Sequence, residues 1–181
     1  MRVLVACEFS GIVRDAFISK GHDAVSCDLL PTESPGPHYQ GDVLEILDDG
    51  WDMMIAHPPC TAICLSGNRW YSNTDERKQA IQFVEKLWLS NIHKICIENP
   101  VGVLTTMSLL PKPQYIQPWQ FGHGETKKTG LWLKNLTRLI PTDIVNGREN
   151  RIHRMSPSKD RSKLRSLTYH GIAQAMADQW G

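Results

Sequence analysis

Short apolar runs alternate with amphipathic stretches along the first half of the chain. The apolar runs have the length and composition of buried strands. They span 2–7, 24–27, 41–43, 52–56 and 94–97. Helical spacing appears over 11–19, with Val13 and Phe17 on one face, and again after Thr74, whose hydroxyl can cap a helix. This alternation predicts an α/β fold with a Rossmann-like, doubly wound and mostly parallel sheet.

The second half of the chain is less regular. Residues 129–133 predict one more strand, and 171–180 predict a short amphipathic helix. Residues 141–166, called the basic segment below, are polar with little periodicity. No repeat or linker marks a boundary, so we expect a single domain over 1–181 that includes this irregular segment.

Composition is that of an ordinary globular protein, with 41% apolar and 22% charged residues in a chain of 181. No run approaches the roughly 20 apolar residues of a membrane span, and the N-terminus opens into a strand pattern instead of a signal peptide. The five cysteines are an odd number without a CxxC motif. They favour free thiols in a reducing, cytoplasmic setting.

Positive charge is concentrated near the C-terminus. Residues 145–165 hold seven Lys and Arg against two acids, which gives +5, although the whole chain carries only +1. The rest of the chain therefore carries −4. Such a segment predicts a polyanionic partner, and the alternative is a solvated surface loop.

Reactive or acidic side chains follow several of the predicted strands. The set comprises Phe9, Asp28, Asp42, Cys60 and Glu98. Because the carboxyl ends of parallel strands meet at one edge of a sheet, where ligands bind, we expect these residues to converge there.

Two motifs carry the candidate chemistry, His57-Pro58-Pro59-Cys60 and Glu98-Asn99-Pro100. Cysteine is the strongest side-chain nucleophile at neutral pH, and a nearby carboxyl group can donate a proton. Together they suit attack on a pyrimidine ring that is protonated elsewhere. Taken alone, Cys60 could equally be a buried and inert cysteine.

With the turn Phe9-Ser10-Gly11, these motifs make the chain resemble the DNA cytosine-5 methyltransferases. The resemblance spans nearly the whole chain and is to compact, phage-type members without a large target-recognition domain. It implies a class I S-adenosylmethionine-dependent methyltransferase fold. It also implies that Cys60 adds to C6 of cytosine while Glu98, with a raised pKa, donates a proton to N3.

The resemblance further implies S-adenosylmethionine as cofactor. The residues expected to bind it are Phe9, Gly11, Asp28, Asp42 and Pro59, and the helix at 171–180 would complete its pocket. An acid such as Asp28, about 20 residues after the turn, can accept both hydroxyls of a ribose. The glycine fingerprint is incomplete, because Val13 and Arg14 stand where further glycines could.

DNA is the expected partner. Lys127 stands for the first arginine of a family motif that steadies the target base and the active-site loop, and we group it with the catalytic residues. The residues expected to bind DNA are Arg69, Arg148, Arg151 and Arg154. Trp70 and Tyr71 either stack on a flipped base or pack their own loop. No histidine and cysteine spacing matches a zinc site, so no metal is expected.

Two alternatives remain open. A carboxylated derivative of the cofactor would deliver a carboxymethyl group, with Arg14 or a pocket lysine binding its carboxylate. Otherwise the chain is a catalytically silent DNA-binding protein on a methyltransferase scaffold, because a fold does not secure a function. The sequence leaves the target sequence, the strandedness of the DNA and the oligomeric state open, a dimer included.

Overall fold

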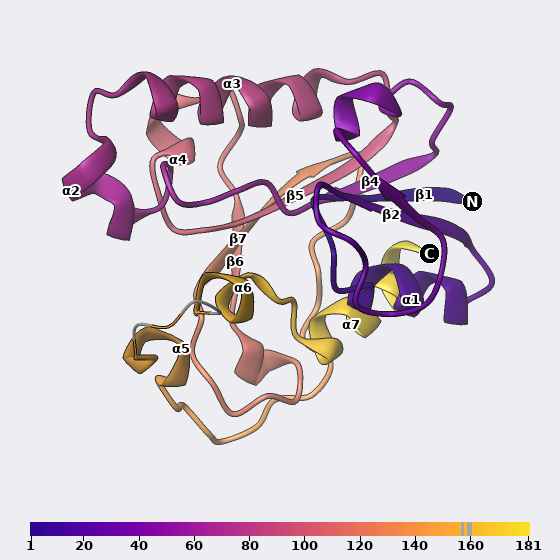
Figure 1. Cartoon of the computed structure of the whole chain (residues 1–181). Coiled ribbons are helices and arrows are strands. Elements are labelled where there is room, and N and C mark those ends of the chain that lie inside the picture. Colours follow the sequence, from indigo (N-terminus) through magenta and orange to yellow (C-terminus); the bar gives the residue numbers. More distant parts are fainter. Residues whose placement is uncertain (157, 159–160) are drawn as a thin grey trace.

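The computed structural model describes residues 1–156, 158 and 161–181. Seven strands form one sheet in the order β3-β2-β1-β4-β5-β7-β6 (Figure 1). The strands are β1 (Arg2–Ala6), β2 (Asp23–Asp28), β3 (His38–Gln40), β4 (Met53–Ala56), β5 (Lys94–Pro100), β6 (Gln114–Ile116) and β7 (Thr129–Lys134). The α-helices are α1 (Ile12–Ser19), α2 (Asn68–Tyr71), α3 (Asp75–Leu89), α4 (Leu104–Met107), α5 (Arg151–Arg154), α6 (Arg161–Ser166) and α7 (His170–Trp180). Three 3-10 turns are η1 (Val43–Glu45), η2 (Leu65–Gly67) and η3 (Pro118–Gln120).

The sheet is parallel from β3 through β5 and antiparallel at its other edge. Strands β3, β2, β1, β4 and β5 pair in parallel, whereas β7 runs antiparallel to both β5 and β6. The chain builds outward from β1 on one side and from β4 on the other, so a switch point lies between these two strands. The predicted doubly wound, mostly parallel sheet is confirmed.

Two strand boundaries differ from those that the sequence predicts. The third strand lies at 38–40 instead of 41–43, because Asp42 caps η1 by accepting a hydrogen bond from Leu44 N. The fifth strand extends to Pro100, because β7 offers Glu98 and its neighbours a second pairing partner. Apolar periodicity does not reveal β6, α5 or α6, since each is shorter than two helical turns or one alternation of strand faces.

Alternate side chains of the central strands enter two separate hydrophobic cores. Leu4, Met54 and Ile95 pack on the face that α3 covers, and Val5 and Ile55 pack on the opposite face. Figure 1 shows α3 on one side of the sheet and α1 with α7 on the other. Because both faces are covered, the parallel strands read as continuous apolar runs in the sequence.

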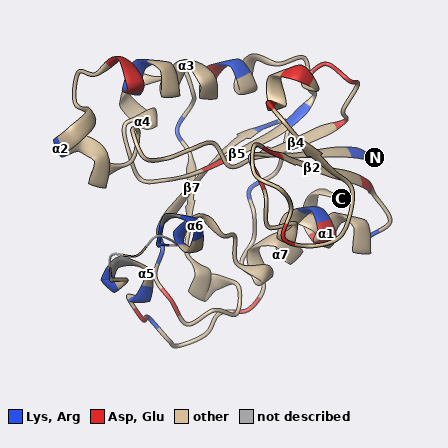
Figure 2. Ribbon diagram, in the orientation of Figure 1, with Lys and Arg blue, Asp and Glu red and all other residues tan. Residues whose placement is uncertain are grey.

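In the view of Figure 2 the Lys and Arg residues of α5 and α6 appear on the same side of the molecule, and Glu149 of the basic segment forms a bridge with Glu125, just before β7. Residues 157, 159 and 160 of the basic segment, which include one lysine of the predicted charge excess, lie outside the described residues. None of the helices described here has both the length and the apolar character needed to cross a membrane.

Arg14 is a fully buried cation that ties α1 to the loop after β2. Its guanidinium group pairs with Asp15, donates to the hydroxyls of Ser26 and Thr32, and donates to the carbonyl of Ser34 at 3.0 Å. With its donors used in this way, Arg14 is not available to bind a carboxylate on a cofactor. The cost of burying the charge is offset by these hydrogen bonds.

Arg14→Met should lower the free energy of unfolding by about 3 kcal/mol, because the acceptors around the lost guanidinium stay buried without donors. Urea denaturation measures this change. Arg138→Met is the matched control, since Arg138 is exposed, and it should change stability by less than about 0.5 kcal/mol. Equal stabilities of the two variants would contradict a structural role for Arg14.

Candidate active site

The turn after β1 has a backbone that only particular residues tolerate. Cys7 adopts φ 57° and Gly11 adopts φ 77°, both in the left-handed region. A Cβ at Gly11 would lie 2.4 Å from the guanidinium of Arg14. The turn thus needs glycine for both its conformation and its space. Phe9 lies between these residues and is buried.

The N-terminus of α1 is occupied by a side chain of the protein itself. Glu8 is buried, and its Oε1 accepts hydrogen bonds from Val13 N at 2.7 Å and from the Ser10 hydroxyl at 3.2 Å. The free N–H groups at a helix N-terminus favour an anion, and here the carboxylate of Glu8 already satisfies part of them. An acid four residues before the helix was the signal in the sequence.

Asp28 is the last residue of β2, Asp42 follows β3, and both lie at one edge of the sheet. In each carboxylate Oδ1 accepts a local backbone hydrogen bond, from Leu30 N at 2.9 Å and from Leu44 N at 3.0 Å. Burial, followed by the charges of Asp28 and Asp42, raises the pKa of Cys27 to about 12. The same influences raise the pKa of Cys7. The predicted convergence of these acids at the end of β1 is thus observed.

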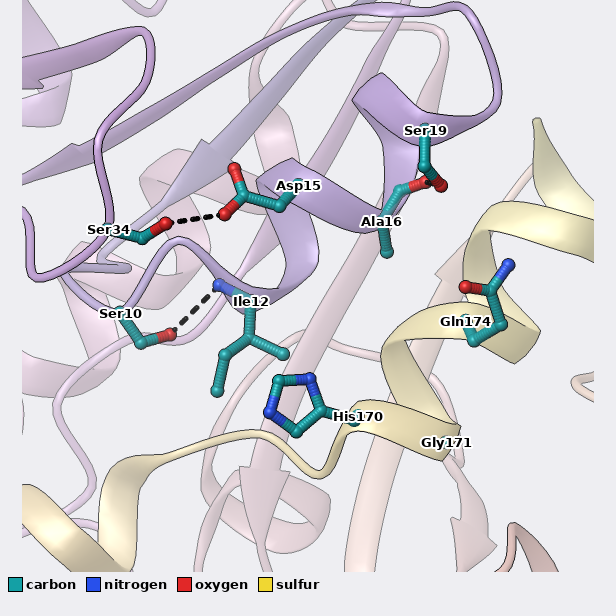
Figure 3. Close-up of a pocket in the computed structure, with 9 residues that line it drawn as sticks. All are labelled: Ser10, Ile12, Asp15, Ala16, Ser19, Ser34, His170, Gly171 and Gln174. Carbon is teal, nitrogen blue, oxygen red and sulfur yellow. Dashed lines mark hydrogen bonds between the residues drawn. The ribbon is translucent and has the colours of Figure 1, made fainter.

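A hollow of about 580 Å³ lies between α1 and α7 (Figure 3). Ser10 and Asp15 line one side, and His170 and Gln174 line the other. Ser34 closes one end and donates a hydrogen bond to Asp15 at 2.7 Å. The C-terminal helix therefore stands directly beside the turn that follows β1.

The loop that carries Cys60 is held by buried hydrogen bonds. The Asn99 side chain donates to the Pro58 carbonyl at 2.8 Å, and Cys64 N donates to the Cys60 carbonyl at 2.9 Å. Gly102 allows the loop to approach β5, since a Cβ there would lie 2.0 Å from the Ile63 carbonyl. Cys60 itself is half-buried in this loop.

Glu98 is ionised in this environment. Burial alone would raise its pKa, but the hydrogen bond from His57 and the positive charge of Lys127 lower the pKa below the usual glutamate range. The expectation of a raised pKa is therefore wrong for the protein without ligands. The sequence showed the burial of Glu98 but not the donor from the neighbouring strand.

Cys60 and Cys64 form a coupled pair of thiols. The hydrogen bond to Cys64, and then burial, raise the pKa of Cys60. The pKa of Cys64 is lowered to about 5, because Cys60 donates to it and because the Ser66 hydroxyl lies 3.0 Å from its sulfur. Because the two thiols interact, the first proton that they release belongs to the pair and not to either cysteine alone. Cys64 follows Cys60 by four residues in the sequence, but that spacing alone does not reveal the contact between the two thiols.

Lys127 joins this cluster from the segment before β7. Its Nζ donates to the Leu167 carbonyl at 3.1 Å, and its charge acts on both Cys60 and Glu98. The three residues that we predicted to be catalytic therefore lie together. Among the described residues, no three His, Cys, Asp or Glu side chains are arranged to hold a metal ion.

Solved structures of other proteins share the fold of this chain. No family model matches the chain, and no curated protein matches its sequence. One similar solved structure is a candidate DNA modification methyltransferase encoded within a prophage (E. coli), at 15% identity, TM-score 0.55, and coverage of 80% of this chain and 52% of that chain. A second is the S. pombe Dnmt2 methyltransferase, at 16% identity, TM-score 0.53, and coverage of 88% and 57%.

The chain has the class I methyltransferase fold. It spans little more than half the length of the two methyltransferases it resembles. Within this fold, the turn after β1, the acids after β2 and β3, and the Cys60 loop after β4 share one edge of the sheet. This is the edge at which open α/β sheets bind ligands.

The arginines predicted to bind DNA are dispersed in this fold. Arg148 stacks on Trp119 at 3.8 Å, and Arg151 pairs with Glu125 at 2.9 Å. Arg69 lies in α2, exposed beside Trp70, and Arg154 is exposed at the end of α5. Arg148, Arg151 and Arg154 are part of the basic segment, and Arg69 lies in the loop after Cys60. Their roles stay predictions.

The thiol pair predicts a specific pH dependence of alkylation. Wild-type protein should begin to react with iodoacetamide near pH 5, because the pKa of Cys64 is about 5 and thiolate is the reactive form. In Cys64→Ala, burial and the charge of Glu98 remain, so alkylation of Cys60 should require a much higher pH. Mass spectrometry of the peptide that contains both cysteines follows the reaction.

The control is Cys64→Ser, which preserves side-chain size but cannot carry the charge at these pH values. It should behave like the alanine variant. An unchanged onset of alkylation in both variants would show that the two thiols are not coupled.

Proposed function

We propose that the protein transfers a methyl group from S-adenosylmethionine to C5 of cytosine in DNA. The observation that carries this proposal is the meeting of Cys60, Glu98 and Lys127 beside one another in a class I methyltransferase fold. C5 of cytosine is a poor nucleophile. A thiol that adds to the adjacent C6, with an acid at N3, supplies the activation that the ring needs.

The side chains divide the work between nucleophile and acid. Cys60 passes its proton to the Cys64 thiolate, and its sulfur forms a bond to C6 while electrons move toward N3. Glu98 takes up a proton from solvent as the base binds and donates it to N3, which limits the negative charge on the ring. Lys127 stabilises negative charge on this side of the site. After methyl transfer the C5 proton leaves to a base, the sulfur–C6 bond breaks, and N3 returns its proton.

The cofactor belongs on the side of Phe9, Gly11, Asp28 and Asp42, with Pro59 at its boundary. These residues can accept hydrogen bonds from the cofactor, because among the described residues both aspartates use only Oδ1 for local hydrogen bonds. Oδ2 of Asp28 can then accept from ribose hydroxyls. When bound there, S-adenosylmethionine supplies an electrophilic methyl group to the ring. The hollow between α1 and α7 adjoins this side of the turn.

DNA fits the same proposal. The two solved structures with a similar fold are named as a candidate DNA modification methyltransferase and as a Dnmt2 methyltransferase. A cytosine in duplex DNA must leave the base stack before Cys60 can reach C6. Arg69 follows Cys60 by nine residues, and the basic segment lies in the C-terminal part of the chain; both provide cations for the phosphates.

A second candidate keeps the thiol chemistry and changes the group transferred. Arg14 is buried and bonded, but Lys163 of α6 places its Nζ 5.3 Å from the Phe9 ring, where it pairs with Glu33. If Lys163 exchanged Glu33 for a carboxylate on the cofactor, that cofactor would deliver a carboxymethyl group. The mass of the modified nucleoside distinguishes the two reactions.

Cys60→Ser should abolish turnover and preserve cofactor binding, because a hydroxyl is far less nucleophilic than a thiolate at neutral pH. DNA that contains 5-fluorocytosine should trap the wild type covalently, since fluorine at C5 cannot leave as a proton. Mass spectrometry of the adduct and of the nucleosides from ordinary DNA gives the readout. An adduct in Cys60→Ser would overturn the assignment, and DNA binding without any modified nucleoside would indicate the silent scaffold.

Asp28→Ala should weaken cofactor binding roughly 10- to 150-fold, because it removes a charge-assisted contact of about 1.5–3 kcal/mol. Isothermal calorimetry measures the affinity. Asp28→Asn is the matched variant, since its amide oxygen still accepts from Leu30 N and preserves the turn. Wild-type affinity in both variants would show that Asp28 does not contact the cofactor, and a loss in alanine alone would assign the effect to the turn.

A further inference from the structure

The side chains of His57 and Glu98 are hydrogen-bonded at the edge of the sheet. His57 Nδ1 lies 3.1 Å from Glu98 Oε2, and the side chains are only 7% and 13% exposed. They extend from neighbouring strands, because Ala56 and Ile97 form the last register pair before them. The pairing of the β4 and β5 backbones therefore fixes the distance between His57 and Glu98.

The contact determines which oxygen of Glu98 is left for a ligand. An ionised carboxylate can only accept hydrogen bonds, so Nδ1 of His57 carries the hydrogen. Among the described residues, Oε2 is the Glu98 oxygen that takes part in a side-chain hydrogen bond. Oε1 is then the oxygen available to a bound base.

Other titratable groups face Glu98 without binding it in this way. Cys60 lies in the loop after β4, Cys96 lies on β5, and Lys127 precedes β7. Lys127 directs a hydrogen bond to the Leu167 carbonyl instead. Within the described part of the chain, His57 is the side chain that hydrogen-bonds to Glu98.

The other nitrogen of the imidazole is a second pointer to a ligand. His57 Nε2 is buried and makes no hydrogen bond with the described residues. A buried polar atom without a partner costs free energy, and such atoms occur where a ligand completes the site. His57 thus binds Glu98 through Nδ1, and its Nε2 is left to hydrogen-bond to a ligand.

We propose that His57 is a positioning residue for Glu98: its hydrogen bond to Oε2 holds the carboxylate so that Oε1 faces N3 of the target cytosine. This inference rests on the proposed function. Glu98 takes one proton from solvent, gives it to N3 as the sulfur–C6 bond forms, and regains it when that bond breaks. His57 keeps its Nδ1 proton throughout and acts only through Glu98.

The sign of the pH effect follows from the hydrogen bond. A donor to the charged form lowers the pKa of a carboxyl group, so loss of the donor raises the pKa of Glu98. Turnover requires protonated Glu98, and kcat/KM falls as the free enzyme loses this proton. Without the His57 donor, the alkaline limb of the kcat/KM profile therefore moves to higher pH.

The test compares His57→Leu with His57→Asn. The leucine variant should lower kcat roughly 10- to 100-fold with little change in KM, and should move the alkaline limb upward. The asparagine variant places an amide N–H near the position of Nδ1, so it should restore both kcat and the position of the limb. An alkaline limb that stays in place in His57→Leu overturns the proposal.

A control separates positioning from general loosening of the site. Asn99→Leu removes another buried bond of the same strand ends, to the Pro58 carbonyl, and should lower kcat without moving the limb. A titration of Glu98 by carbon-13 NMR in ligand-free protein gives a readout that needs no activity. The Glu98 pKa should rise in His57→Leu and return in His57→Asn, and equal values overturn the proposal.

The proposed function is tested separately by the 5-fluorocytosine adduct of the wild type. Failure to form that adduct would reject the methyl-transfer proposal, while the NMR titration would still decide whether His57 controls Glu98. A normal adduct together with an unmoved limb would reject the positioning role alone.

Discussion

The parallel pairing of β4 with β5 is the constraint on which the candidate site depends. Its last register pair, Ala56 with Ile97, sets His57 and Glu98 opposite each other just beyond it. Two further bonds hold the loop that follows, from His57 N to the Ala6 carbonyl and from the Asn99 side chain to the Pro58 carbonyl. Because these groups are buried, a shift of the loop would leave them unsatisfied, and this cost keeps the Cys60 thiol beside Glu98.

Two charged side chains of the N-terminal half, Glu8 and Arg14, bind groups of the protein itself. Glu8 accepts hydrogen bonds from the first N–H groups of α1, and Arg14 donates a hydrogen bond to the loop after β2. The ligand-facing edge is left with Asp28 and Asp42, whose charges raise the pKa values of the nearby thiols. An edge of this sign favours a cationic ligand over an anionic one, which agrees with a sulfonium cofactor.

The Cys60–Cys64 pair and the His57–Glu98 pair set the pKa values of the groups that would react. A single cysteine and a single carboxyl group would each have to be tuned by burial, which raises the pKa of both. Here each group has a hydrogen-bonded neighbour, Cys64 for the thiol and His57 for the carboxylate. Each proton needed by the proposed reaction therefore has a defined neighbour that influences when it is gained or lost.

The sequence by itself determined the fold class, the central strands and the list of residues at the sheet edge. Apolar runs buried on both faces and capping residues such as Thr74 are local signals, and they act independently of what packs around them. The shifted third strand at 38–40, the extension of β5 and the existence of β6 depend on pairing partners distant in the chain.

Only the tertiary structure decided the state of the site. The lowered pKa of Glu98 requires a donor that is 41 residues away in the chain, and the burial of Arg14 requires a loop that folds back over it. Residue types showed which groups could react. Ionisation depends on distances between groups on different elements, and such distances exist only after the sheet has formed.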